Sequence, residues 1–85
     1  MKHPTTDPLA ALKNVDWLIS NGGEISLGAF GSVECAAVAS DESDCLAMLQ
    51  RRDGESLYQL LTRLDAAIAR AWDEGEFTDE INPNC

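Results

Sequence analysis

Residues 56–75 read SLYQLLTRLDAAIARAWDEG, and this stretch gives the clearest structural signal in the sequence. Its apolar side chains recur at steps of three or four, which is the spacing of one face of an α-helix. Ser56 followed three residues later by Gln59 is a capping-box signature, and Gly75 is a typical helix stop. The pattern therefore predicts a helix between Ser56 and Gly75. The side chains expected to face a sheet are Leu57, Leu60, Leu61, Leu64 and Ile68.

A second helix is predicted near the amino terminus, over about residues 8–20. Thr6 or Asp7 can cap it, and Pro8 suits its first turn. The apolar residues with helical spacing in this segment are Leu9, Leu12, Val15 and Ile19. Residues 21–23, Asn-Gly-Gly, should end the helix, because glycine adopts the left-handed backbone conformation without steric cost.

Between the two helices the sequence changes to patterns typical of β-strands. Residues 24–30 alternate, with Ile25 and Leu27 on one side, and residues 33–39 are almost entirely small or apolar. Residues 45–51 are ambiguous, because their composition favours a helix whereas their length and flanking turns favour a strand. An isolated two-stranded hairpin is marginal in water, so we assign 45–51 to a third strand.

The second and third strands also predict the state of two cysteines. If Ala39 pairs with Cys45 across the turn at 40–44, then Cys35 lies opposite Leu49. This register places Cys35 about 13 Å from Cys45 along the strands, beyond the ~7 Å Cα separation that a disulfide tolerates. We therefore expect no internal disulfide between them.

Together these elements predict an α+β fold: a three-stranded antiparallel sheet packed against two helices, in the order α-β-β-β-α. The alternative replaces the third strand by a helix. The 85 residues amount to a single small domain, 1–85. We expect flexible tails at about 1–6 and 78–85.

The sequence offers few groups for catalysis or metal binding. The one histidine, His3, lies in the amino-terminal tail, so no serine or cysteine has a ready general base. The three cysteines, Cys35, Cys45 and Cys85, are widely spaced and form no C-x-x-C pair. We therefore expect reduced thiols, no metal site, no cofactor and no enzymatic activity. The first residues lack the apolar run of a signal peptide or a membrane span, which favours a cytoplasmic location.

Charge is the most unusual property of the chain. Fifteen acidic and six basic residues give a formal net charge of −9. Such a charge repels phosphate backbones and anionic membranes, so direct binding to nucleic acid or to a membrane is not expected. It exceeds the ~2–8 charges that suffice for the solubility of a small domain. The excess suits binding to a basic surface on another protein.

Eight of the fifteen acidic residues gather in two segments, a turn at 41–44 and a carboxy-terminal stretch at 73–80. Clusters of this kind are often only solvated surface. In the functional interpretation they imitate a phosphate backbone, and exposed aromatic residues such as Trp17 and Trp72 anchor an interface beside them. The candidate partner-binding residues are Asp41, Glu42, Asp44, Asp73, Glu74, Glu76, Phe77, Asp79 and Glu80.

These properties lead to two functional hypotheses. The first is a small, acidic, non-enzymatic protein-interaction module, and more specifically an inhibitor that covers the basic, nucleic-acid-binding surface of a partner protein. In size and acidity the chain looks like phage-borne anti-CRISPR proteins, a likeness of class that rests on no shared motif. The alternative is a self-associating structural or regulatory domain that uses an exposed strand edge or helix face. We expect a monomer or a homodimer.

Overall fold

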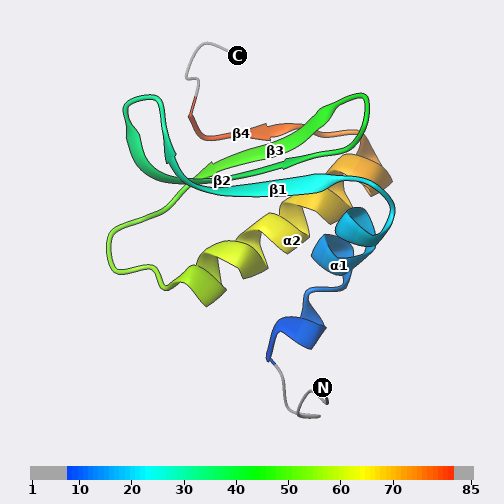
Figure 1. The fold of residues 1–85 in the computed structure, drawn as a ribbon, viewed down its shortest axis with the longest axis horizontal. Helices are drawn as coiled ribbons and strands as arrows, with labels where there is room; N and C mark the ends of the chain where they lie inside the picture. The colour runs from blue at the N-terminus through cyan, green and yellow to red at the C-terminus, as the bar shows by residue number, and fades with distance from the viewer. Residues whose placement is uncertain (1–7, 82–85) are drawn as a thin grey trace.

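Two α-helices pack on one face of a four-stranded sheet in residues 8–81, the part of the chain that this computed structural model describes (Figure 1). The elements in chain order are η1 (Pro8–Ala11, a 3₁₀ turn), α1 (Lys13–Ser20), β1 (Glu24–Phe30), β2 (Val33–Ser40), β3 (Cys45–Gln50), α2 (Leu57–Glu74) and β4 (Thr78–Asp79). The strands lie in the order β1-β2-β3-β4. The first three are antiparallel, whereas β4 runs parallel to β3. The predicted α+β class is confirmed.

Helix α2 begins and ends where the sequence predicts. The hydroxyl of Ser56 accepts the N–H of Gln59 at 3.0 Å, and Oε1 of Gln59 accepts the N–H of Ser56 at 2.9 Å, which completes the capping box. Gly75 closes the helix with a φ of 69°. The prediction that Leu57 faces the sheet is wrong, because its side chain is 48% exposed, whereas Leu60 in the same turn is fully buried. The buried residues of α2 are Leu60, Leu64, Ala67 and Ile68.

The sheet has one strand more than the sequence predicts. Cys45–Gln50 forms β3, so the assignment of this segment to a strand is confirmed and the helical alternative is wrong. Beyond it, Thr78–Asp79 pairs in parallel with Ala47 and Met48, and the N–H of Glu80 donates to the carbonyl of Met48 at 2.8 Å. A purely antiparallel, three-stranded sheet is therefore wrong in this detail. A strand of two residues has no periodicity from which it could be predicted.

The predicted carboxy-terminal tail is partly placed on the sheet. Residues 78–81 follow the edge of β3, and Oδ1 of Asp79 accepts the N–H of Ile81 at 2.9 Å. The rest of that tail, 82–85, lies outside the described residues, as does the predicted amino-terminal tail at 1–6.

The register between β2 and β3 differs from the predicted one. Ser40, not Ala39, lies opposite Cys45, and Ala39 pairs with Ala47, because a bulge shifts the register between these two pairs. Cys35 then lies five residues along β2 from the position opposite Cys45, about 17 Å at ~3.3 Å per residue. Both thiols are free, so the expected absence of a link between them holds despite the wrong register.

Helix α1 is shorter than the predicted helix over 8–20, because residues 8–11 form a 3₁₀ turn. Its first turn is capped from the other helix: Oδ1 of Asp65 accepts the N–H groups of Asn14 and Val15 at 2.8 and 2.9 Å. Oδ2 of Asp65 also accepts the side-chain amide of Asn14 at 3.0 Å. This carboxylate satisfies N–H groups that have no partner within α1, and it lies at the positive end of the helix dipole.

The turn after α1 needs glycine at two positions, and the predicted helix end at 21–23 is confirmed. Gly22 has a φ of 91°, in the left-handed region that disfavours other residues. A Cβ atom on Gly23 would lie 2.6 Å from Cγ of Leu18 and 2.9 Å from the carbonyl oxygen of Ser40. Glycine at position 23 therefore lets the chain pass closely between Leu18 of α1 and the end of β2.

The core lies between α2 and the two central strands. Leu64 and Ile68 of α2 are fully buried with Ala37 of β2 and Leu49 of β3. β1 is less covered, because α2 packs on β2 and β3 while the short α1 contacts β1. Leu27, which the alternation in β1 places on the apolar side, is accordingly 46% exposed.

Candidate functional site

The two tryptophans meet where the two α-helices touch. Trp17 of α1 and Trp72 of α2 make an edge-to-face contact, with ring centroids 5.0 Å apart and ring planes at 75°. Both remain open to solvent, at 56% and 38% exposure. In this geometry one indole points its edge at a face of the other. The first ring therefore keeps both of its faces uncovered, and the second ring keeps one face uncovered. The pair therefore offers aromatic surface to a ligand while it holds α1 against α2.

A hollow lies on each side of the tryptophan pair, and the two hollows differ in charge. One, of about 410 Å³, is lined by Lys13 and Asn14 with both indoles. The other, of about 450 Å³, is lined by the indoles, by Leu18 and Asn21, and by the acidic turn that follows β2. The indoles thus separate a rim that carries a cation from a rim that carries carboxylates. The sequence singles out Trp17 as an interface anchor but not Lys13, Asn14 or Leu18, because nothing local indicates which side of α1 meets α2.

The acidic loop, Asp41–Asp44, is held in shape by one of its own carboxylates. Oδ1 of Asp41 accepts the N–H groups of Ser43 and Asp44 at 2.8 and 2.7 Å. Hydrogen bonds from the Asp44 and Ser43 amides lower the pKa of Asp41 below its ordinary 3.8, so this carboxylate is ionised at neutral pH. Glu42 and Asp44 are exposed. The three predicted acids here thus divide into one that shapes the loop and two that face solvent.

The carboxy-terminal cluster of predicted residues is divided by the fold. Asp73 and Glu74 end α2, and Glu76 follows the glycine cap; all three are exposed. Glu76 makes a loose ion pair with Arg70, at 3.9 Å. Phe77 is 47% exposed beside them. These four predicted residues remain available to a partner.

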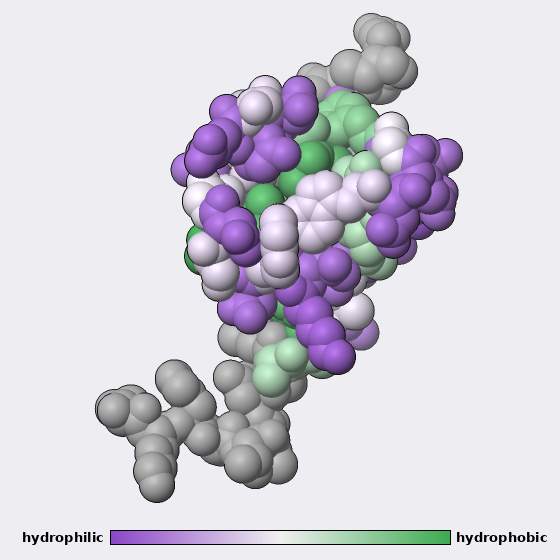
Figure 2. Space-filling model, turned by 90° about the vertical axis from the view of Figure 1, so that its right-hand side faces the viewer, coloured by the Kyte–Doolittle hydropathy of each residue, from purple (hydrophilic) through white to green (hydrophobic). Residues whose placement is uncertain are grey.

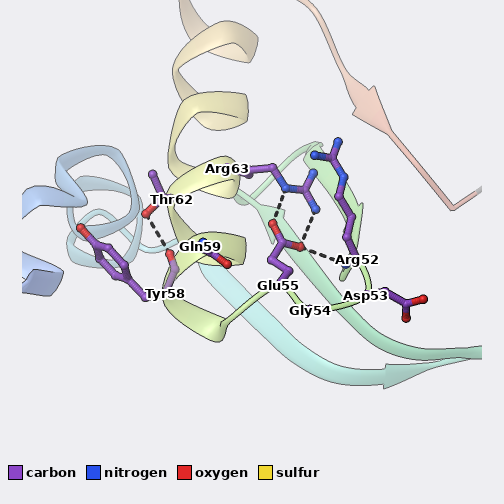
Figure 3. A pocket seen from close by; sticks show the side chains of 8 residues that line it. All are labelled: Arg52, Asp53, Gly54, Glu55, Tyr58, Gln59, Thr62 and Arg63. Atoms are coloured by element: carbon purple, nitrogen blue, oxygen red, sulfur yellow. Dashed lines mark hydrogen bonds and ion pairs between the residues drawn. The ribbon is translucent and has the colours of Figure 1, made fainter.

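Glu80 belongs instead to an ion network at the start of α2. Its Oε2 lies 2.8 Å from Nη1 of Arg63. Nε and Nη2 of Arg63 hold the two carboxylate oxygens of Glu55 at 2.6 and 2.9 Å (Figure 3). These bonds, with one from the N–H of Arg52, lower the pKa of Glu55 from 4.5 to about 2. Glu80 therefore ties β4 to α2, and Asp79 lies in β4 itself. Both carboxylates are therefore less available to a partner than the sequence predicts.

A hollow of about 560 Å³ opens beside this network (Figure 3). Its one interior carboxylate, Glu55, is only 8% exposed and is already paired with Arg63. The hydroxyl of Thr62 donates to the carbonyl of Tyr58 at 2.8 Å. Because its interior charged groups, Glu55 and Arg63, are paired with one another, we assign this hollow a structural role.

The exposed acids from both predicted clusters lie at one end of the molecule. The β2–β3 loop, α1 and the carboxy-terminal end of α2 lie together at the right of Figure 1. Figure 2 looks onto this end and shows pale and green surface at its centre, bordered by hydrophilic purple areas. We call this region the acidic end. It comprises Trp17, Trp72 and Phe77 with Asp41, Glu42, Asp44, Asp73, Glu74 and Glu76.

Residues 8–81 show few other reactive arrangements. Among them no three His, Cys, Asp or Glu side chains are grouped so that they could hold a metal ion. No helix in that range combines the length and apolarity needed to cross a bilayer. Burial raises the pKa of the Cys45 thiol above 9.0, so it stays protonated at neutral pH and is a poor nucleophile.

No family model, curated protein or solved structure matches the chain. Fold and site together therefore define its class: a small α+β domain with one end that combines exposed indoles and carboxylates.

Proposed function

We propose that the protein is an acidic, non-enzymatic protein-interaction module that binds a basic surface of a partner protein through its acidic end. The observation that carries the proposal is the Trp17–Trp72 pair, which is exposed to solvent beside the carboxylates of the acidic loop. Large aromatic side chains that stay exposed on a small domain are typical anchors of protein interfaces.

The two kinds of side chain contribute to binding in different ways. Burial of indole surface supplies affinity, at ~25 cal/mol per Å² of apolar area. The carboxylates, and the net charge of −9, attract a basic partner and accelerate its association. This attraction is screened over ~8 Å at physiological ionic strength. Salt should therefore slow association more than it speeds dissociation.

In the more specific form of the proposal, the partner is a nucleic-acid-binding protein and our protein is its inhibitor. Carboxylate oxygens accept hydrogen bonds from arginine and lysine much as phosphate oxygens do. The exposed carboxylates of the β2–β3 loop and of the end of α2 would then occupy positions on the partner that otherwise hold phosphates. Such an inhibitor competes with DNA or RNA for its partner.

The test compares two double variants that carry the same charge. Glu42→Gln/Glu74→Gln removes one exposed carboxylate from the acidic loop and one from the end of α2. Glu34→Gln/Asp53→Asn removes one exposed carboxylate from the start of β2 and one from the β3–α2 loop, two segments that lie at the left of Figure 1, opposite the acidic end. Immobilised wild type recovers a partner from a host lysate, the partner is purified, and its association rate with each variant is measured at two salt concentrations. We expect slower association for the first double variant and wild-type association for the second.

Several outcomes would count against the proposal. They are the recovery of no protein, the recovery of a partner without a basic surface, and equal association rates for the two double variants at low salt. Thermal melts of both variants show whether a slow rate reflects an altered fold. If the partner binds nucleic acid, wild type should displace that nucleic acid, and the Glu42→Gln/Glu74→Gln variant should displace it poorly.

A second function, self-association, is favoured by the edge of the sheet. Within residues 8–81 the outer edge of β1 pairs with no strand, and Leu27 and Phe30 are 46% and 45% exposed there. An open edge of this kind can add a strand from a second copy. We place this function second, because the register shift between Gly28 and Phe30 interrupts the edge and the negative charge opposes association. A monomer mass by light scattering over a wide concentration range would contradict it.

A further inference from the structure

The hollow of about 450 Å³ has one aromatic wall and one acidic wall. Trp17 and Trp72 form the first wall, and Asp41, Glu42 and Ser43 form the second. Pockets for small ligands span ~300–1,000 Å³, so this volume suits a single side chain or a similarly small group. We call it the acidic hollow.

Both walls favour a cation. The face of an indole attracts a cation that lies within ~6 Å of the ring centroid, and the T-shaped pair leaves such faces uncovered. Both hydrogen bonds that Asp41 accepts from the described residues go to its Oδ1. Its Oδ2 is therefore left as an acceptor for a ligand. Glu42 also lines this wall and is exposed to solvent, so it adds a second carboxylate to the hollow.

The surroundings favour this hollow over its neighbour on the other side of the indoles. Lys13 stands at the rim of that neighbouring hollow and would repel a second cation. The acidic hollow has two carboxylates and no cation in its lining. A positively charged group is therefore directed to the acidic side of the tryptophan pair.

We infer that the acidic hollow binds the guanidinium group of an arginine side chain that the partner presents. A guanidinium is planar, so it can lie on an indole face while its N–H groups point to carboxylates at the edge. A lysine ammonium makes a point contact and is more strongly hydrated. The inference rests on the proposed function and specifies the residue on the basic partner that the acidic end recognises.

The test uses the full chain, labelled with ¹⁵N and titrated at low ionic strength with three blocked tripeptides that differ in one residue, arginine, lysine or glutamine. Chemical shifts of the Trp17 and Trp72 indole N–H groups and of the Ser43 amide report on the acidic hollow. We expect saturable shifts at all three groups with the arginine peptide, smaller shifts with the lysine peptide and none with the glutamine peptide.

Variants of the walls add a second measurement. Trp17→Leu keeps an apolar side chain without a π face and should weaken arginine-peptide binding ~2–5-fold. Glu42→Gln should weaken it by up to about fivefold. The control Glu34→Gln removes an exposed carboxylate from the far end of β2 and should leave binding unchanged.

Three results would overturn the inference: equal responses to the arginine and glutamine peptides, shifts at Asn14 in place of Ser43, and wild-type binding by Trp17→Leu and Glu42→Gln. If the purified partner still associates more slowly with Glu42→Gln/Glu74→Gln, such a result overturns the arginine site alone and the proposed function stands. If the arginine peptide binds as expected but the partner has no basic surface, the proposed function fails and the site itself stands.

Discussion

The assigned inner face of α2 can be tested with two substitutions of the same kind in the same helix. Leu57 and Leu64 are two helical turns apart, and both belong to the apolar stripe of the sequence. Leu64 is fully buried, whereas Leu57 is 48% exposed. We expect Leu64→Ala to destabilise the protein strongly and Leu57→Ala to destabilise it little.

The expected magnitudes follow from burial. A fully buried Leu→Ala substitution costs ~2–5 kcal/mol, because it removes apolar contact and leaves a cavity. Because Leu57 is about half exposed, its truncation removes about half of the ~1.5–3 kcal/mol that full burial of such a side chain contributes. Solvent fills the space that is left, so no cavity forms and the cost is ~1 kcal/mol. At ~0.05–0.15 kcal/mol per residue, 85 residues give a total stability of ~4–13 kcal/mol. Leu64→Ala therefore removes a large share of the whole.

Urea and thermal unfolding, followed by circular dichroism, measure both variants against wild type. At ~4–8 °C per kcal/mol for a domain of this size, Leu64→Ala should lower Tm by roughly 10 °C or more. Leu57→Ala should lower it by less than ~8 °C. Equal stabilities of the two variants would refute the packing of α2 described above, because no face of this helix would then be the buried one.

Three further predictions concern contacts outside this stripe. Asp65→Ala should destabilise the protein by ~0.5–2 kcal/mol in urea melts, while Asp65→Asn, which keeps an acceptor for the first turn of α1, should lose less. Arg63 holds the pKa of Glu55 at about 2, below the ordinary 4.5. The contribution of this pair to the stability of the fold should therefore be complete above pH 4.5 and be lost as the pH falls towards 2. In an acid titration, the Glu55→Gln variant should lose less stability over that range than wild type. Gly23→Ala should cost ~1–3 kcal/mol in thermal melts, because its Cβ would meet the carbonyl of Ser40, and a melt equal to wild type would contradict that close approach.

The parts of the fold that the sequence predicts are those controlled by local interactions. The capping box joins Ser56 to a residue three positions away, and Gly75 ends the same helix through its own φ. A global consideration, the weakness of a two-stranded hairpin, favours a strand at 45–51, and the structure confirms it. Local pattern and simple packing rules were sufficient for these elements.

The missed features depend on contacts between distant residues. Asp65 looks like an ordinary polar residue of a helix, yet it caps a helix that begins about 50 positions earlier. Glu80 looks like one more acid of a cluster, yet Arg63 binds it from α2. The register of β3 depends on a bulge between the pairs made by Ala39 and Ser40. No periodicity marks any of these contacts, because each depends on how whole elements meet.

The same division separates the acids that stabilise the fold from those at the acidic end. Glu55 and Glu80 are paired with Arg63, and Asp65 caps α1, so each has a structural partner. Asp73 and Glu74 have the opposite relation to the fold. They lie in the last turn of α2, which contains no basic residue, where negative charge is unfavourable against the helix dipole. Stability does not explain carboxylates at that position, whereas the proposed recognition of a basic partner beside two exposed indoles would.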